Sequence, residues 1–246
     1  MHNNINKYER FHSKTKAQSR IISENNFTYR HIIYFINKYL KKNANVLDIG
    51  CGAGTVCFYI AGKGNKVLGF DISPKAIRAC QESSLIMGLN KLAKFKVINF
   101  PEQTVKEKFD LIIFSEVIEH LQNDNLALKK IYNLLNKAGT LIITTPSLHA
   151  PLYRIGYATG FDERVGHRRR YIIEGLSKQC GKSGFTIVET QGIEGVIRNF
   201  LFLNPVAGRF VRFIKFFMSD VVTFVDNLTI PIFGESNIIV VARKSS

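Results

Sequence analysis

The 246-residue chain has few cysteines, few acidic residues and no long apolar run. Its 4 cysteines form no CxxC pair and are too sparse for a disulfide framework, so we expect a reducing, cytoplasmic environment. No uncharged apolar stretch approaches the ~20 residues of a membrane helix, and no apolar segment follows the basic start as in a secretory signal. Because 46% of the residues are hydrophobic, a chain that is disordered throughout is excluded.

The scarcity of acidic residues gives the chain a formal net charge of +15, with 19 Asp and Glu against 34 Lys and Arg. Only +3 of this charge lies in residues 45–150, and the rest lies in residues 1–44 and 151–246. Net charge informs association and not fold, so a nucleic-acid partner, an anionic membrane and a merely basic soluble protein all stay open. The excess charge therefore belongs to the two ends of the chain.

Short aliphatic runs alternate with helical stretches between residues 45 and 145, which predicts an α/β fold with a parallel sheet wrapped by helices. The predicted strands are residues 45–49, 66–70, 95–99, 109–114, 140–144, 185–189 and 237–243. The predicted helices are residues 74–87, 124–136 and 172–181. In the second helix, the apolar stripe is expected to consist of Leu126, Ile131, Leu134 and Leu135.

The sharpest motif is VLDIGCGAG at residues 46–54, where a strand runs into a glycine-rich turn and then a helix. Glycines also make tight turns that bind nothing, but Asp71 ends the next strand, where a carboxylate can accept both hydroxyls of a ribose. A dinucleotide site has GxGxxG spacing, whereas here Asp48 precedes the first glycine and disfavours a bound phosphate. The loop therefore predicts a nucleoside ligand with cationic groups, and S-adenosylmethionine, with its ammonium and sulfonium, fits.

Four motifs in order, VLDIGCGAG, GFDIS, FDLIIFSEVIEHL and GTLIITTPS, resemble the class I S-adenosylmethionine-dependent methyltransferases. Within that class they are most similar to the group that includes the ubiquinone-biosynthesis O-methyltransferases. The resemblance covers about residues 28–192 plus the last strand. It implies a doubly wound, Rossmann-like, mostly parallel sheet of seven strands, with the last strand antiparallel and inserted beside residues 185–189. We expect one domain over residues 1–246, with an N-terminal arm (1–27) and a helical insertion (195–234).

The resemblance also implies which residues hold the S-adenosyl-L-methionine cofactor. Glycine-loop residues would contact its methionine and ribose portions, Asp71 its ribose hydroxyls and Ile72 its adenine. Asn99 or Phe100 stands where relatives often place an acidic residue for the adenine amino group. Arg30 would pair with the cofactor carboxylate, unless it is only a solvated helix charge. The expected cofactor-binding residues are Arg30, Asp48, Gly50, Cys51, Gly52, Gly54, Asp71, Ile72, Asn99, Phe100 and Ser115.

Two histidines are the candidate catalytic residues, because methylation of a hydroxyl needs a base near neutral pKa. His120 follows the fourth predicted strand, and His167 lies in GHRRRY, a segment that resembles methyltransferases found alongside enzymes of lipid-linked glycans. His120 could instead only cap or pack, and His167 is a second base or a substrate contact. The resemblance further implies Glu116, Glu119 and His120 as ligands of a divalent metal such as magnesium. Because the same letters occur in members not known to need metal, the sequence assigns no metal.

The three arginines at residues 168–170 suggest a grip for phosphate or nucleic acid, or else a loop that pairs with Asp162 and Glu163. Between the last two strands, a helical wheel predicts an amphipathic basic helix. Its apolar face would be Val206, Phe210, Phe213, Ile214, Phe217 and Val221, and its basic face Arg209, Arg212 and Lys215. A lid over the substrate, a membrane-resting surface and a dimer contact are the open interpretations of this insertion.

The leading hypothesis is an O-methyltransferase for a small apolar or lipid-linked acceptor, such as a quinone precursor or glycolipid, acting in the cytoplasm or at the inner face of the membrane. An RNA methyltransferase is the rival, favoured by the charge and the arginine run. However, residues 115–118 read SEVI, where amino-group methylators of nucleic acids typically carry Asn/Asp-Pro-Pro-aromatic. A non-catalytic module peripheral to the membrane is the second alternative, and the intact glycine loop argues against it.

Overall fold

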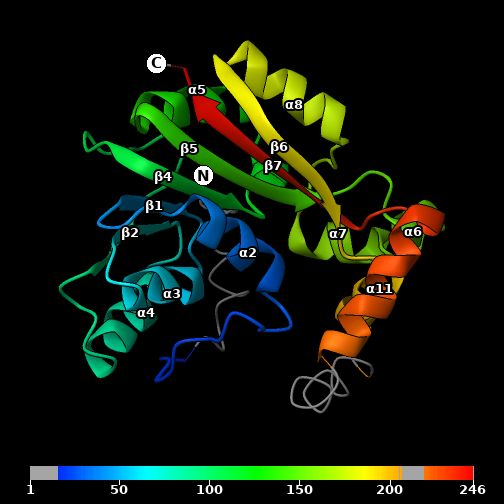
Figure 1. Cartoon of the computed structure of the whole chain (residues 1–246), viewed down its shortest axis with the longest axis horizontal. Helices are drawn as coiled ribbons and strands as arrows, with labels where there is room; N and C mark the ends of the chain where they lie inside the picture. Colours follow the sequence, from blue (N-terminus) through cyan, green and yellow to red (C-terminus); the bar gives the residue numbers. More distant parts are fainter. Residues whose placement is uncertain (1–15, 205, 207–218, 246) are drawn as a thin grey trace.

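A computed structural model describes residues 16–204, 206 and 219–245 of the chain. Within these residues, seven strands form one sheet in the order β3-β2-β1-β4-β5-β7-β6 (Figure 1). The strands are β1 (Asn45–Ile49), β2 (Lys66–Asp71), β3 (Ala93–Val97), β4 (Phe109–Ser115), β5 (Leu135–Pro146), β6 (Phe185–Ile193) and β7 (Asn237–Lys244). The first five run parallel, and β7 lies antiparallel between β5 and β6, which confirms the predicted sheet.

Helices cover both faces of the sheet, as the doubly wound fold requires. On one face lie α2 (Arg30–Tyr39), α3 (Thr55–Gly62) and α4 (Pro74–Ile86), packed on strand residues such as Ile113. On the other face lie α5 (Asp124–Leu134) and α8 (Ile173–Lys182), packed on residues such as Ile112 and Phe114. Successive strand residues point to opposite faces, so an uninterrupted aliphatic run such as the one in β4 serves both cores.

Several predicted boundaries are wrong, since β5 and β6 are longer than the expected 140–144 and 185–189, and β3 and α5 are displaced or shorter. The third strand was expected at residues 95–99, but β3 ends at Val97. Asn99 instead starts a loop, because its N–H donates to the side chain of Gln103 and its carbonyl accepts from the Gln103 N–H. The helix expected to reach residue 136 ends two residues earlier, because β5 already begins at Leu135, which pairs with Phe109 of β4.

The apolar stripe of α5 also differs from the prediction. Asn123 caps the helix by accepting from the N–H of Leu126, and this start turns Leu126 toward solvent. The side chains that face the sheet are Ala127, Leu128, Ile131 and Leu134, whereas Leu135 is buried as part of β5.

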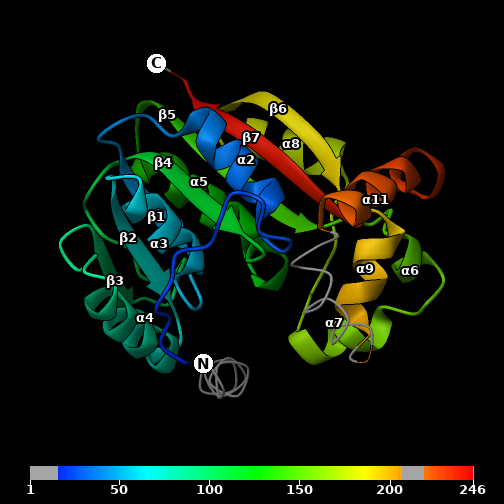
Figure 2. The ribbon, with the colours of Figure 1, turned by 60° about the horizontal axis from the view of Figure 1, so that its bottom comes forward.

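Four further helices gather beyond one end of the sheet (Figure 2). They are α6 (Pro151–Arg154), α7 (Thr159–Val165), α9 (Val196–Leu203) and α11 (Ser219–Phe233). The last two belong to the predicted helical insertion. Most of its amphipathic helix, residues 207–218, lies outside the described residues, as do residues 1–15 of the expected arm. No helix among the described residues combines the length and the apolarity that crossing a bilayer requires.

A buried ionic junction joins α9 and α11 to the segment before α2. Arg198 of α9 is 1% exposed, and its Nη2 donates to the Phe27 carbonyl and to Glu194 Oε1, at 2.6 and 2.9 Å. Its guanidinium lies 4.3 Å from the centre of the Phe27 ring. Asp226 of α11, fully buried, accepts from the N–H groups of Gly195 and Arg198. These contacts fix the position of α9, which also borders a cavity at the edge of the sheet.

Candidate functional site

A cavity of about 1500 Å³ lies at the carboxyl ends of β1, β2, β4 and β5. Its other walls come from α2, α7, the loop after α7, and α9. Ligands of open α/β sheets bind at this edge of the strands, because the loops that follow the strands meet there. The position of the cavity in the fold therefore marks it as the candidate site.

The glycine loop forms one wall of the cavity and is pinned to β2. The N–H groups of Gly50 and Cys51 both donate to the Phe70 carbonyl at 2.8 Å. Gly50 has a φ of 77°, and a Cβ there would lie 2.3 Å from Cγ2 of Val117. Only glycine therefore combines this backbone conformation with this approach to the segment after β4.

Asp71 ends β2 beside the glycine loop and lines the cavity. Its Oδ2 accepts from the Gly52 N–H and its Oδ1 from the Ser73 N–H, both at 2.9 Å. A carboxylate offers about four lone pairs, so it retains acceptors for the two hydroxyls of a ribose. Ser73 caps α4 by accepting from the Ala76 N–H, so Asp71 is not needed as the cap of that helix.

Asp48 lies beneath the loop, 4% exposed, and accepts a hydrogen bond from the Cys57 thiol at 3.2 Å. Burial raises the pKa of Asp48 to about 7, and the charge of Asp71 adds to this although the thiol opposes it. A cation bound in the cavity would favour the ionised form. This buried carboxyl thus gives the cavity a preference for positively charged ligands.

Most of the predicted cofactor residues come together here. The cavity is lined by Asp48, Gly50, Cys51, Gly52, Asp71, Ile72, Asn99, Phe100 and Ser115. Gly54 instead caps α3 at a φ of 77°, and a Cβ there would press on Cys80 and Phe58. Arg30 is turned toward α11, where it donates to Thr223 Oγ1 at 2.7 Å and pairs with Asp220. The structure therefore gives Arg30 a different partner from the predicted cofactor carboxylate.

Two polar residues of the cavity wall were not predicted from the sequence. His31 Nε2 and Asn199 Oδ1 are buried and have no hydrogen-bond partner among the described residues. Burial, and then the charges of Arg198 and Arg30, lower the pKa of His31 to about 3, so its ring is neutral at physiological pH. A buried polar atom without a partner is costly, and both atoms are placed to bind polar groups of a ligand. Neither residue lies in a recognisable motif.

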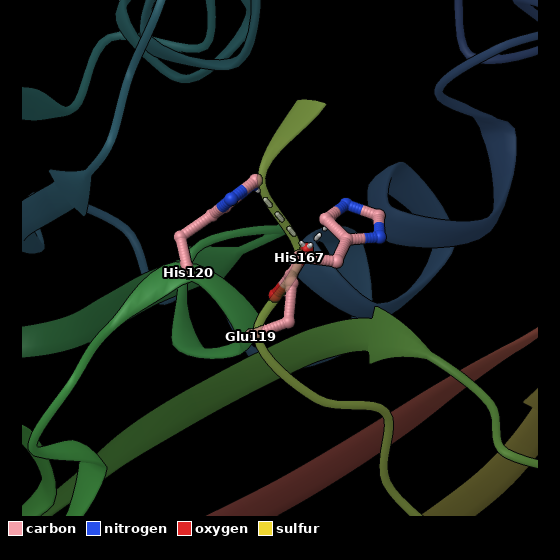
Figure 3. A group of neighbouring side chains, drawn as sticks. All are labelled: Glu119, His120 and His167. Atoms are coloured by element: carbon pink, nitrogen blue, oxygen red, sulfur yellow. Dashed lines mark ion pairs between the residues drawn. The ribbon is translucent and has the colours of Figure 1, made fainter. Parts of the chain in front are cut away.

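The two predicted catalytic histidines meet around a buried carboxyl (Figure 3). Glu119 and His120 belong to the short helix η2 (Ile118–His120) after β4, and His167 follows α7. The Nε2 atoms of His120 and His167 lie 3.9 and 3.8 Å from Oε1 of Glu119, whose side chain is fully buried. Burial, and then the charge of Glu116, raise the pKa of Glu119 well above its usual range. We call these three residues the Glu119 cluster.

His167 is held in place by a salt-bridged aspartate. Its Nδ1 lies 2.9 Å from Asp162 Oδ1, and Arg170 donates to both oxygens of the same carboxylate at 2.7 Å. Partial burial would raise the pKa of Asp162, but these hydrogen bonds outweigh it and keep the pKa below its usual value. Because the ionised carboxylate accepts from Nδ1, Nε2 of a neutral His167 carries the lone pair that faces the cavity.

The arginines at residues 168–170 form hydrogen bonds and ion pairs with other residues of the same chain. Arg168 donates through Nε to the His120 carbonyl, and its N–H donates to the Glu119 carbonyl. Arg169 pairs with Asp124 at 2.7 Å, and Arg170 pairs with Asp162. The expected pairing with Asp162 is therefore confirmed, although the Arg170 side chain in this pair is buried and not solvated, and Asp124 is a further acidic partner.

Comparison with known proteins agrees with the fold. The doubly wound sheet, glycine loop and β2 carboxylate define a nucleoside-binding Rossmann-like protein. A family model described as a methyltransferase domain matches residues 40–177, more than half of the chain. The chain belongs to this methyltransferase family, which confirms the recognition of a class I S-adenosylmethionine-dependent methyltransferase and its cofactor.

Among curated relatives, the ubiquinone biosynthesis O-methyltransferase of Glaesserella parasuis is 35% identical over 114 residues, covering 45% of this chain and 48% of that protein. The ajmaline N-methyltransferase of Rauvolfia serpentina is 30% identical over 105 residues, covering 42% and 36%. The matches thus span less than half the length of these relatives. Their names include both oxygen and nitrogen acceptors.

Two solved structures show the same fold at low sequence identity. Phosphoethanolamine N-methyltransferase 2 of Haemonchus contortus, in complex with S-adenosyl-L-methionine, has a TM-score of 0.70 at 16% identity, covering 100% of this chain and 58% of that chain. A SAM-dependent methyltransferase of Archaeoglobus fulgidus has a TM-score of 0.64 at 18% identity, covering 96% and 99%.

Proposed function

We propose that the chain transfers the methyl group of S-adenosylmethionine to a hydroxyl of a small apolar acceptor. One observation carries this proposal: a single cavity joins the glycine loop and Asp71 to the two imidazoles of the Glu119 cluster. The first part suits the nucleoside of the cofactor, and the second suits a group that must lose a proton. The named O-methyltransferase relatives support the same acceptor atom.

In the proposed reaction, the acceptor oxygen attacks the methyl carbon in line with the carbon–sulfur bond. That bond breaks, its electron pair stays on sulfur, and S-adenosylhomocysteine leaves as the product. The hydroxyl proton passes to Nε2 of His167, the lone-pair nitrogen fixed by Asp162. His120 packs against the His167 ring, with centroids 4.9 Å apart, and orients it. The sulfonium supplies the activation, so the protein chiefly positions the two reactants.

The acceptor side of the cavity favours an apolar molecule. Phe161 of α7 and Phe202 and Leu203 of α9 line it, and α11, which packs against α9, exposes apolar side chains such as Phe224 and Ile232. A lipid-linked acceptor delivered at a membrane surface, with α9 and α11 of the predicted insertion as a lid, is part of this proposal. Because all three arginines of residues 168–170 donate to oxygens of this chain, we do not favour RNA as the acceptor.

The test is turnover by the full chain with S-adenosylmethionine and a panel of apolar phenols and catechols, measured as S-adenosylhomocysteine formed. We expect His167→Gln to lower kcat by about 10²- to 10⁴-fold, the usual contribution of a general base, while cofactor affinity changes little. His149→Gln serves as the control, since this exposed histidine lies outside the cavity lining. Full kcat in His167→Gln, or no product with any hydroxyl acceptor, would contradict the proposal.

A further inference from the structure

The Glu119 cluster has a feature that proton transfer alone does not explain. Oε2 of Glu119 accepts from Thr145 Oγ1 at 3.0 Å, but Oε1 has no hydrogen-bond partner among the described residues. The nearest imidazole nitrogens, at 3.8 and 3.9 Å, are beyond hydrogen-bond reach. A fully buried carboxylate oxygen without a donor is costly, and this one is aimed between two imidazoles.

The hydrogen bonds behind the two rings decide which nitrogen carries the proton. Nδ1 of His120 lies 3.2 Å from the Gly166 carbonyl, and a carbonyl only accepts, so Nδ1 is the donor. Nδ1 of His167 donates to Asp162 in the same way. With Nδ1 as the donor, the lone pair of each imidazole is on Nε2, the atom that faces Glu119. Three electron-pair donors, one from each residue and all within 4.8 Å of one another, converge on one point.

We propose that Glu119, His120 and His167 bind one divalent transition-metal ion of the zinc, manganese or iron class. Two imidazoles and one carboxylate, with positions left open, form the donor set that such ions take in catalytic sites, whereas magnesium takes oxygen donors. Asp162 and the Gly166 carbonyl hold the ligand rings from behind, as outer-shell partners of metal-bound histidines do.

This ligand set differs from the one that the sequence motif suggests. Glu116 would be the third ligand by the motif, but its Oε1 accepts from Thr144 Oγ1 at 2.8 Å and the residue does not belong to the converging group. His167, 51 positions further along the chain, takes its place because α7 and the following loop fold over η2. The chain thus replaces one oxygen ligand by a nitrogen ligand, which shifts the preference away from magnesium.

The inference rests on the proposed function and deepens it by naming what the cluster binds. With an ion bound, both imidazoles are ligands and Nε2 of His167 is no longer the proton acceptor. Lewis acidity at the ion would then lower the pKa of the acceptor hydroxyl, and its proton would pass to solvent. Without one, His167 remains the base. Metal binding needs neither acceptor nor S-adenosylmethionine, so its failure would leave the proposed methyl transfer standing, and failed methyl transfer would leave the metal site standing.

The experiment uses the full chain, freed of metal by a chelator and titrated with Co²⁺ while its visible absorption is recorded, followed by competition with Zn²⁺ and Mg²⁺. We expect one equivalent of Co²⁺ with absorption bands of nitrogen and oxygen ligation, displaced by Zn²⁺ and not by an excess of Mg²⁺. Glu119→Gln and His167→Ala should weaken binding by more than about 100-fold, and Asp162→Asn by about 10- to 100-fold.

Two control variants distinguish the Glu119 cluster from metal binding elsewhere on the chain. Glu116→Gln should bind Co²⁺ like the wild type, which a site formed by the sequence motif would not. His149→Ala removes an exposed imidazole 3.4 Å from Glu235 and should also change nothing. Circular dichroism checks that each variant folds. Absence of a bound equivalent in the wild type overturns the proposal whatever the variants do, and so does a site lost in Glu116→Gln but kept in His167→Ala.

Discussion

At the scale of single residues, the ionisation of Asp48 has the clearest effect on the stability of the fold. Its folded-state pKa of about 7 lies above the ordinary value of 3.8, so the folded protein holds more protons between these pH values than the unfolded chain. The contribution of Asp48 to stability therefore falls as pH rises through this range. Each pKa unit corresponds to about 1.4 kcal/mol, so the loss at pH 8 reaches a few kcal/mol.

We predict that Asp48→Asn raises the unfolding free energy of the ligand-free protein at pH 8, by up to about 4 kcal/mol, with the gain vanishing near pH 4. The same variant should bind S-adenosylmethionine more weakly, since its cationic groups lose a nearby carboxylate. Urea unfolding across pH and calorimetric titration measure the two effects. Glu82→Gln on the exposed side of α4 is the control. If Asp48→Asn instead lowers the unfolding free energy at pH 8, the buried charge of Asp48 does not destabilise the folded protein.

The sequence predicted those site residues whose position follows from a strand end. Gly50 and Asp71 come directly after β1 and at the end of β2, and parallel strands bring such positions together without further information. His31 lines the cavity and Arg30 does not, because Arg30 is bound at α11 by Thr223 and Asp220, which lie 193 and 190 residues away. Likewise, Glu119 meets His167 only through tertiary packing. Contacts between residues this far apart in the sequence leave no pattern in the local sequence.

At the scale of elements, the turn from β1 into α3 depends on backbone conformation and on one close approach. Gly50 combines a φ of 77° with Val117 packed where a side chain would begin. Gly64, in the turn after α3, has a φ of 84° and open space around it. Substitutions at the two positions therefore separate the free-energy cost of a left-handed backbone conformation from the free-energy cost of a steric clash with Val117.

We predict that Gly64→Ala lowers the unfolding free energy by about 1–2 kcal/mol, the cost of a left-handed conformation with a Cβ. Gly50→Ala should cost more, because Val117 must also move, and it should weaken cofactor binding. Urea unfolding of both variants and calorimetry with S-adenosylmethionine provide the comparison. Equal destabilisation by the two substitutions would mean that the approach of Val117 does not constrain the loop.

Element boundaries were predictable where capping and hydrophobic period agree, as at Ser73 and Pro74 before α4. They failed where tertiary pairing overrides local preference. Leu135 continues the apolar pattern of α5, but its pairing with Phe109 starts β5 instead. Of the four helices beyond the sheet end, α6 and α7 were not predicted. The helices α9 and α11 were predicted only as part of an insertion, because they are organised by the buried Arg198 and Asp226 and not by a simple amphipathic repeat.

At the scale of the whole molecule, that buried junction ties the chain segment near Phe27 to α9 and α11. We predict that Arg198→Met destabilises the protein by about 3–5 kcal/mol, because Glu194 and Asp226 would keep their charge without the buried guanidinium. Lys38→Met, which removes an exposed partner of Glu189, should cost less than about 1 kcal/mol. Both values come from urea unfolding. If the two variants lose similar unfolding free energy, the buried junction does not stabilise α9 more than an exposed ion pair would, and the prediction is contradicted.

The net charge of +15 also changes its meaning once the chain is folded. Arg30, Arg198 and the arginines of residues 168–170 are all engaged with oxygens of the same chain. Part of the basic excess therefore fixes the walls of the cavity and is not offered to a polyanion. Composition alone does not distinguish these two uses of arginine.

The central claim is that one cavity places the cofactor's sulfur next to the Glu119 cluster. A crystal structure of the full chain with S-adenosylhomocysteine tests it most directly. We predict ribose hydroxyls on Asp71 and the sulfur turned toward His120 and His167. A nucleoside bound away from Asp71, or a sulfur turned away from both histidines, would contradict the account.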